Sequence, residues 1–245
     1  MQARWLDWLF APRCVACGVV QTDPKSDPMC EPCRASLDEI GPACPRCAEP
    51  TEQGGACTRC RHTPLALERI VSPWQFGGQL AVAIRRLKLA GHTDVARAIA
   101  PLWAPLIAAA AEPGAIVVPV PTHWRRRFRR GFDHAWLLAL HACASVALPR
   151  PVAALRKLRP TAPQSTLPAA QRRTNLRGCF AARVSVTGRS IVLVDDVATT
   201  GTTLSECAQT LLDAGAVRVV GVVLARSTAA GSPRAHPSPK PGTMP

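Results

Sequence analysis

The feature that most constrains this chain is the segment 191–203, which has the sequence IVLVDDVATTGTT. Four aliphatic residues lead directly into Asp195 and Asp196, a pattern typical of a buried parallel strand that ends at a site. Threonines around Gly201 follow, and the apolar spacing over 204–212 predicts a helix. A strand, a small-residue loop and a helix N-terminus together favour an anion, because backbone N–H groups and the helix dipole face it.

The two aspartates beside this loop should bind a different part of the same ligand. Carboxylates repel phosphate, so they suit sugar hydroxyls, or a sugar together with a divalent ion. A phosphosugar is the simplest ligand that meets both demands. A Walker-type P-loop is excluded, because no Gly-Lys-Ser/Thr sequence follows a four-residue gap. A buried strand with a merely polar turn is disfavoured, since two buried carboxylates are costly without a ligand or donors.

The N-terminal region contains four Cys-x-x-Cys pairs, and each pair can bind one side of a tetrahedral metal ion. The pairs are Cys14 with Cys17, Cys30 with Cys33, Cys44 with Cys47, and Cys57 with Cys60. Two pairs complete one shell of thiolates, so the region is expected to hold two structural zinc ions. Metal would supply the folding energy that this polar, proline-rich segment lacks. Sequential pairing, as in a double zinc ribbon, is the expectation, and interleaved pairing is the alternative.

Disulfide bonds are the competing interpretation of these cysteines. The first ten residues are interrupted by Arg4 and Asp7, unlike a secretory signal, and no apolar run reaches the length of a membrane span. The expected location is therefore the cytoplasm, where thiols stay reduced and metal binding is favoured. A redox motif is disfavoured because one pair would suffice. Cys143, Cys179 and Cys207 are predicted to be small core residues.

The charge distribution separates the two parts of the chain. The net charge is +14, yet residues 1–62 contain seven Lys/Arg and eight Asp/Glu, which sum to −1. Each thiolate-bound zinc site would add a charge of about −2. The N-terminal module therefore suits a scaffold or interaction role better than independent DNA binding. Residues 63–245 carry the net positive charge of the chain, which favours a polyanionic substrate or nucleic acid as the ligand of this part.

Hydrophobic periodicity over the larger part predicts alternating strands and helices. Strands are expected at 69–76, 115–121, 152–155 and 217–225, and helices at 79–89, 94–111 and 135–146. Ligands of open parallel sheets bind outside the carboxyl ends of the strands. The prolines that close 115–121 and the loop after Asp196 are therefore expected at the same edge.

The most basic segment is 123–134, where five arginines are interleaved with Trp124, Phe128 and Phe132. One interpretation is a nucleic-acid contact, with arginines on phosphates and aromatic rings stacked on bases. Another is a flexible hood that closes over pyrophosphate and excludes water. The third is a solvated basic hairpin without a ligand.

These motifs together resemble the ComF family (competence protein F, ComFC/GntX-like), and the strand-loop segment resembles the signature of type I phosphoribosyltransferases. The segments that carry the resemblance are the cysteine module, Leu87-Lys88 with Gly91, Val118-Pro119-Val120-Pro121, Arg130-Gly131-Phe132, Gln164, Arg172 with Asn175, and the Asp195-Asp196 loop. The resemblance implies an α/β, type I phosphoribosyltransferase-like fold: a Rossmann-like, mostly parallel sheet with helices on both faces and a flexible hood. The expected division is a double zinc-ribbon module over 1–62, the phosphoribosyltransferase-like domain over 63–230 and a disordered tail over 231–245.

The resemblance also implies a ligand, 5-phosphoribosyl-1-pyrophosphate (PRPP) with Mg²⁺, and a set of residues for it. Asp195 and Asp196 are the expected catalytic residues and would bind the ribose hydroxyls. The further expected PRPP-binding residues are Ala198, Thr199, Thr200, Gly201, Thr202, Thr203, Lys88, Arg125, Arg126 and Arg130. One departure is that Gly-Phe-Asp133-His134 replaces the usual Gly-Phe-Asn-Gln, which places a negative charge near the expected pyrophosphate.

Three functions remain open at this stage. The first is a phosphoribosyltransferase that acts in DNA uptake or nucleotide-related metabolism, by displacement at ribose C1 with a nitrogen nucleophile. The second is a non-catalytic PRPP sensor or an adaptor for single-stranded DNA or a helicase. The third is a protein-docking zinc module without turnover. His134 is a candidate acceptor base on position alone, and no membrane insertion is expected.

Overall fold

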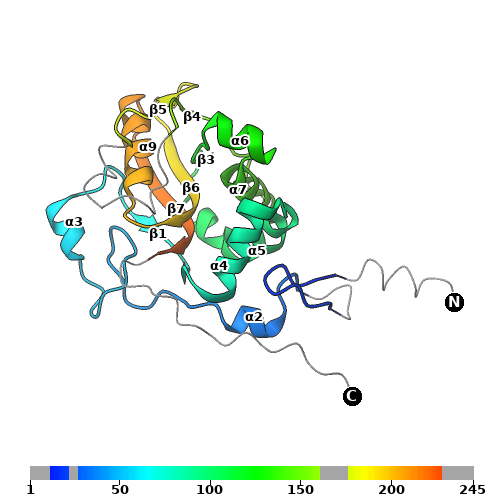
Figure 1. Ribbon diagram of the computed structural model, residues 1–245. Coiled ribbons are helices and arrows are strands. Elements are labelled where there is room, and N and C mark those ends of the chain that lie inside the picture. The colour runs from blue at the N-terminus through cyan, green and yellow to red at the C-terminus, as the bar shows by residue number, and fades with distance from the viewer. Residues whose placement is uncertain (1–11, 22–26, 161–175, 228–245) are drawn as a thin grey trace, which may run out of the picture.

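The computed structural model describes residues 12–21, 27–160 and 176–227 (Figure 1). Gln164, Arg172 and Asn175, the N-terminal residues 1–11 and the predicted tail lie outside the described residues. The division of the chain at residues 62 and 230 therefore stays a prediction.

The centre of the molecule is a parallel sheet of five strands in the order β1-β7-β6-β3, with β2 also paired to β7. The strands are β1 (Ile70–Val71), β2 (Trp74–Gln75), β3 (Ile116–Pro119), β6 (Ser190–Ala198) and β7 (Arg218–Arg226). The two long strands β6 and β7 lie in the middle and are buried along most of their length, which explains their continuous aliphatic sequences. The single strand expected over 69–76 is instead two short strands that pair with β7 one after the other.

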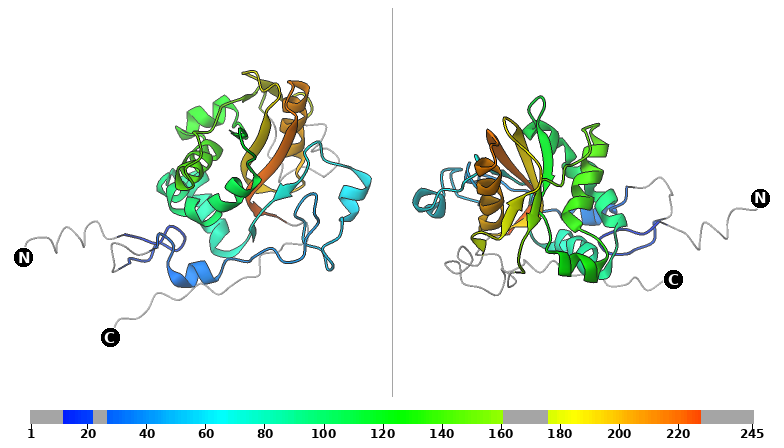
Figure 2. Two further views of the ribbon diagram at one scale, coloured as in Figure 1. Left: turned by 180° about the vertical axis from the view of Figure 1, so that it is seen from behind. Right: turned by 90° about the horizontal axis from the view of Figure 1, so that it is seen from above.

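Helices cover both faces of this sheet (Figure 2). One face packs against α4 (Gly78–Ala90), α5 (Asp94–Ala110) and α7 (His134–Ser145), and the other packs against α9 (Thr202–Asp213). Alternate residues of β6 supply the two cores: Val192 and Val194 join the first, while Ile191 and Leu193 join the second. This arrangement confirms the predicted α/β fold with helices on both faces.

Two elements beside β3 differ from the sequence-based expectation. The strand predicted at 152–155 begins later, as β4 (Leu155–Lys157), which pairs antiparallel with β5 (Phe180–Ala182). The arginine-rich segment forms a helix, α6 (Trp124–Arg130), so the hairpin interpretation is wrong. The His123 side chain accepts a hydrogen bond from Arg125 N at 3.3 Å at the start of α6, and Gly131, with φ of 82°, ends the helix.

The described part of the N-terminal module, 12–21 and 27–62, contains two short helices, α2 (Glu31–Ala35) and α3 (Thr58–His62), each directly preceded by a cysteine. The module packs against the larger domain at two places. Val15 and Met29 belong to the core on the α4 side, and Cys44 and Cys47 belong to the core on the α9 side. Among the described residues, no helix has the length and apolar character needed to cross a membrane.

Candidate functional site

Two adjacent carboxylates, Asp195 and Asp196, lie near the carboxyl end of β6, at the edge of the sheet where a ligand is expected. Asp196 is 3% exposed, and its Oδ1 accepts a hydrogen bond from Val197 N at 2.6 Å. Asp195 is less deeply buried, and its Oδ1 accepts from Asp196 N at 2.9 Å. The alternation of a β-strand directs the two side chains to opposite faces of the sheet, so their surroundings differ.

Two side chains from different helices contact the Asp196 carboxylate. Its Oδ2 lies 2.5 Å from Lys88 Nζ on α4 and 3.2 Å from His134 Nε2 at the start of α7. Burial opposes ionisation of Asp196, but these two neighbours hold its pKa below the ordinary value. Burial lowers the pKa of His134, and the charge of Asp196 counteracts this only in part.

Asp195 has the opposite character. Burial and the neighbouring charge of Asp196 raise its pKa to about 8. Ligand atoms of His134, Asp195 and Asp196 lie within 4.8 Å of one another. This group therefore combines one ionised carboxylate, one carboxylate that is protonated at neutral pH and one imidazole. Carboxylate oxygens of this kind suit a hard divalent cation, which would compensate the negative charge when Asp195 ionises, or sugar hydroxyls, which can donate hydrogen bonds to them.

The loop after β6 turns sharply into α9, and Gly201 is required for this turn. Its φ is 77°, and a Cβ at this position would lie 2.9 Å from Ile70 Cδ1. The hydroxyls of Thr200 and Thr202 are 2.7 Å apart, and Thr203 lies in the first turn of α9. The backbone therefore forms the compact strand-loop-helix turn that an anion-binding loop requires.

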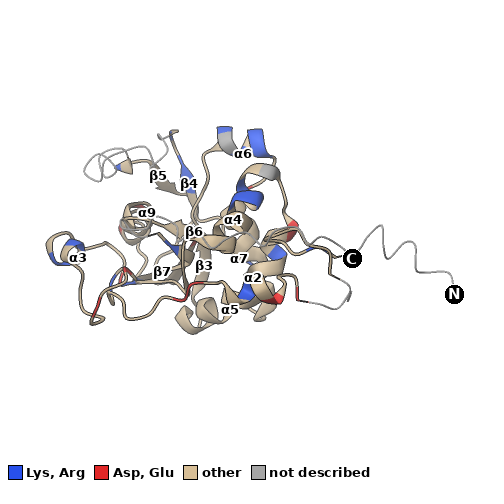
Figure 3. Ribbon diagram, turned by 60° about the horizontal axis from the view of Figure 1, so that its bottom comes forward, with Lys and Arg blue, Asp and Glu red and all other residues tan. Residues whose placement is uncertain are grey.

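The three arginines that were expected to bind PRPP, Arg125, Arg126 and Arg130, all lie on α6. Arg130 lies near the site, because its charge contributes to the lowered pKa of His134. Arg125 is exposed, and its guanidinium stacks over Trp124 at 5.4 Å from the ring centroid. The Arg126 side chain lies outside the described atoms. Figure 3 shows Lys and Arg positions, in blue, along α6.

Asp133, the departure from the usual family motif, has a structural role. Its carboxylate accepts hydrogen bonds from Thr122 N at 3.0 Å, from Thr122 Oγ1 at 3.3 Å and from Trp136 N at 3.5 Å. The side chain thus caps α7 and ties it to the segment that follows β3. An aspartate directly before an apolar helical segment is an N-cap signal, and this signal could have predicted the role from sequence.

A cavity of about 590 Å³ lies between α6, α7 and β4, beside the end of β3. Its aromatic lining residues are Trp124, Phe132 and Trp136. Its basic lining residues are Arg127, Arg156, Lys157 and Arg183. Of the described lining residues, Asp133 alone is acidic, and its carboxylate already accepts the hydrogen bonds given above. The cavity therefore offers aromatic rings together with positive charge.

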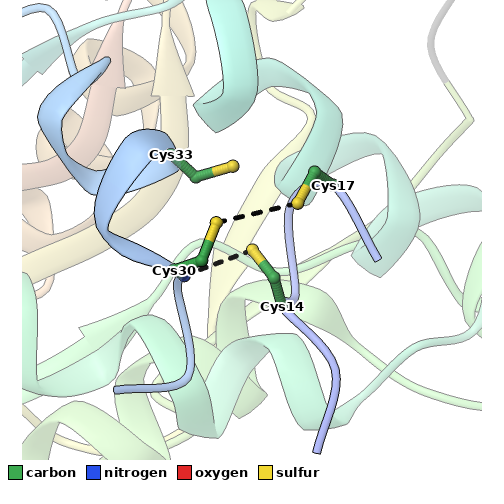
Figure 4. A group of neighbouring side chains, drawn as sticks. All are labelled: Cys14, Cys17, Cys30 and Cys33. Carbon is green, nitrogen blue, oxygen red and sulfur yellow. Dashed lines mark hydrogen bonds between the residues drawn. The ribbon is translucent and has the colours of Figure 1, made fainter. Parts of the chain in front are cut away.

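The eight cysteines of the N-terminal module form two groups of four, paired sequentially as expected. Within each group the sulfur atoms all lie within 4.8 Å of one another. Figure 4 shows the first group, in which Cys17 Sγ and Cys30 Sγ are 3.7 Å apart; the corresponding distance between Cys47 and Cys57 is 3.6 Å. A tetrahedral site with Zn–S bonds of about 2.3 Å has sulfur–sulfur edges of about 3.8 Å, so both groups fit a zinc ion.

One thiol of each group has a lowered pKa, whereas burial, the largest cause, raises the pKa of Cys30, Cys33, Cys47 and Cys60. Burial alone would raise the pKa of Cys14, but the backbone N–H groups around it lower that pKa to about 7. The same balance lowers the pKa of Cys44 to about 7. The three other cysteines, Cys143, Cys179 and Cys207, are buried core residues, as the sequence predicted.

Sequence analysis missed one fully buried charge, Arg226 at the end of β7, which forms an ion pair with Glu49 of the cysteine module. An arginine that closes an otherwise aliphatic strand was the only signal for it. Its partner is distant in sequence, so no local pattern could have identified the pair.

Comparison with known proteins defines the class first. Residues 5–61 match the double zinc ribbon domain, and residues 137–238 match the phosphoribosyl transferase domain. The chain is thus a double zinc ribbon joined to a domain of the phosphoribosyltransferase type. Among solved structures, the glutamine PRPP amidotransferase from B. subtilis complexed with ADP and GMP is 26% identical, with a TM-score of 0.36, over 52% of this chain and 26% of that chain.

The particular family follows from whole-length relatives. The chain is 32% identical over 197 residues to the DNA utilization protein YhgH of Escherichia coli O157:H7, covering 78% of this chain and 87% of the relative. It is 26% identical over 208 residues to competence protein F of Haemophilus influenzae, covering 81% and 90%. It is 27% identical over 210 residues to competence protein ComFC of Bacillus subtilis, covering 81% and 84%. The protein belongs to this family, the ComF family.

Proposed function

We propose that the protein binds PRPP together with Mg²⁺ at the carboxyl edge of β6, and that it acts in the use of DNA. The observation that carries this proposal is the unequal aspartate pair beside the glycine-turned threonine loop. Asp195 has a raised pKa and, among the described residues, forms no ion pair like the one between Lys88 and Asp196. A ligand with a divalent cation or sugar hydroxyls on one side and a phosphate on the other satisfies both parts of the site.

Each predicted residue has a place in this proposal. Asp195 and Asp196 face the ribose hydroxyls and the cation, and the backbone and hydroxyls from Ala198 to Thr203 surround the 5-phosphate. Lys88 has a supporting role, because its ammonium group holds the Asp196 carboxylate at 2.5 Å. Arg130, together with Arg125 and Arg126, supplies positive charge for the pyrophosphate on the α6 side.

Such a site is suited to transfer of the phosphoribosyl group. Bound magnesium supplies charge neutralisation for the pyrophosphate leaving group. Asp195 and Asp196 orient the ribose and stabilise the positive charge that develops on it as the C1 bond breaks. His134 is held by Asp196 at 3.2 Å, so it fixes that carboxylate; this contact argues for a positioning role rather than that of an acceptor base.

Two structural zinc ions complete the proposal, one in each cysteine group. Sulfur atoms at zinc-compatible distances and the match to the double zinc ribbon domain support this assignment. Reduced thiolates of this kind suit the cytoplasm, where we place the protein. The relatives named for DNA utilization and competence support a role in the handling of incoming DNA.

A second candidate function, single-stranded nucleic acid binding, rests on α6. Trp124 is 62% exposed and Phe128 is 87% exposed on this arginine-rich helix. Exposed rings between basic side chains can stack on bases while the arginines contact phosphates. The aromatic and basic cavity beside α6 extends the same surface.

Calorimetric titration of the zinc-loaded protein with PRPP and Mg²⁺ tests the first proposal. We expect saturable binding that is lost in Asp195→Asn. Asp213→Asn is the matched control, because Asp213 is an exposed carboxylate on α9 that accepts a hydrogen bond from Gln209 Nε2 at 2.8 Å. Equal PRPP affinity in the wild type and Asp195→Asn would disprove the site assignment.

A further inference from the structure

Arg226 connects the second cysteine group to the threonine loop. Its side chain is 0% exposed at the end of β7. Nε donates to the carbonyl oxygen of Cys47 at 2.8 Å, and Nη2 forms an ion pair with Glu49. Nη1 donates to the carbonyl oxygens of Ala198, at 2.9 Å, and of Thr199. One buried guanidinium therefore joins the metal-binding knuckle to the first two carbonyls of the loop.

The two carbonyl groups that accept hydrogen bonds from Arg226 determine the direction of the N–H groups that follow them in the loop. In a planar trans peptide the C=O and the following N–H point in opposite directions, and no cis peptide occurs among the described residues. When Ala198 O and Thr199 O face Arg226, the N–H groups of Thr199 and Thr200 face away from it. The Ser227 N–H also donates to Ala198 O, at 2.8 Å, so Arg226 shares the orientation of the first carbonyl with the strand backbone and holds the second, Thr199 O, by its side chain.

The cysteine group fixes Arg226 in turn. Cys47 is itself one of the four cysteines, and Glu49 lies two residues beyond it. Arg59, which lies between Cys57 and Cys60, donates to the same Glu49 carboxylate oxygen at 3.1 Å and to Thr199 O at 3.4 Å. Two arginines thus share one carboxylate and one loop carbonyl. Metal binding orders the backbone around both cysteine pairs of this group. It therefore also orders Glu49, the carboxylate that both arginines contact.

We propose that the second cysteine group, through Glu49, Arg226 and Arg59, positions the phosphate-binding amides of the threonine loop. Arg226 is then a positioning residue for the loop, and the zinc ribbon is a component of the ligand site. The consequence for PRPP rests on the proposed function above. Because linkage is reciprocal, a phosphate ligand in the loop would also strengthen metal retention by this group.

Glu49→Gln is the variant that tests this role, since it removes the shared anchor and keeps the side-chain shape. Glu68→Gln is a matched control. Glu68 also pairs with an arginine of β7, Arg218, at 2.5 Å, but at the opposite end of the strand. Arg59→Met, at a partly exposed residue, is a milder variant that decides the matter if Glu49→Gln does not fold.

Two readouts on the zinc-loaded proteins separate the loop effect from the ligand effect. The first is the backbone order parameters of Thr199, Thr200 and Gly201 from ¹⁵N relaxation, measured without ligand. We expect these to fall in Glu49→Gln, to fall less in Arg59→Met and to stay unchanged in Glu68→Gln. The second is calorimetric PRPP affinity, which we expect to weaken roughly tenfold in Glu49→Gln, since charge-assisted amide contacts are lost.

Rigid loop amides in both Glu49→Gln and Arg59→Met would overturn the proposal. Absence of PRPP binding by the wild type would overturn the proposed function instead, and the order parameters would still decide the role of Arg226. If the loop amides lost as much order in Glu68→Gln as in Glu49→Gln, the effect would be a general loss of stability, and this result would also overturn the proposal.

Discussion

Replacement of Asp195 by asparagine should stabilise the ligand-free protein, and increasingly so as the pH rises. The Asp195 carboxyl has a pKa of about 8 in the folded protein, against an ordinary value of 3.8, because burial and the Asp196 charge disfavour ionisation. Asparagine has nearly the same shape and cannot ionise. The variant therefore removes the electrostatic cost and leaves the rest of the loop intact.

The sign and size follow from proton linkage. A carboxyl with a raised folded pKa stabilises the folded state fully below the unfolded pKa of 3.8, and this contribution is lost as the pH rises through about 8. Each pH unit in that window is worth about 1.4 kcal/mol. Between pH 6 and pH 8 the wild type should therefore lose about 2 kcal/mol relative to the asparagine variant, allowing for partial ionisation near the upper limit.

Urea unfolding of zinc-loaded, magnesium-free protein, followed by tryptophan fluorescence, measures this difference. The stability gap between wild type and Asp195→Asn should widen steadily from pH 6 through pH 7 to pH 8. Asp213→Asn, which changes an exposed carboxylate on α9, is the control variant. A constant gap for Asp195→Asn would mean that the carboxyl ionises normally in the fold, and the unequal aspartate pair would have no physical basis.

Three further predictions address other parts of the molecule. Cys14→Ser should reduce zinc content from two ions to one by atomic absorption, whereas the buried core variant Cys143→Ser should retain two; unchanged zinc in the former would contradict the ligand assignment. Binding of a single-stranded oligonucleotide should weaken steeply with salt and lose roughly 1–3 kcal/mol in Trp124→Ala, and a flat salt dependence would exclude phosphate contacts. Asp133→Ala should lower the unfolding free energy by about 1 kcal/mol while Asp133→Asn changes it little, because asparagine also caps helices; equal losses in thermal unfolding would argue against the cap.

The central elements of the fold could be predicted because their signals are local. The aliphatic run into Asp195 and the apolar spacing after Gly201 specify a strand, a turn and a helix within one short segment. The prediction of one continuous strand over 69–76 was wrong, because the segment forms two short strands. Pro73, which lies between them, could have indicated the break, since proline has no N–H to donate to the sheet. The arginine-rich helix was missed because its charges outweigh any helical periodicity, and its ends depend on His123 and Gly131.

The site was predictable only in part, for a similar reason. Sequence pattern placed the two aspartates at a ligand edge, but it treated them as equivalent. Their difference depends on Lys88 and His134, which come from two helices that meet at Asp196 only after both have packed on the same face of the sheet. No spacing within the chain encodes that convergence. The raised pKa of Asp195 is a consequence of burial and was therefore also beyond the sequence.

The contacts of the cysteine module suggest why it accompanies this domain. The first group adjoins α4, where Arg86 Nη1 donates to the carbonyl oxygens of Cys14, Val15 and Ala16 at 3.2–3.4 Å. Arg86 lies two residues before Lys88, which neutralises Asp196. The second group reaches the threonine loop through Arg226. Each half of the module thus contacts an element that forms one side of the proposed ligand site. A module that served only as a tether would not need a buried arginine at this junction, so we infer that the zinc ribbon and the proposed PRPP site form one structural unit.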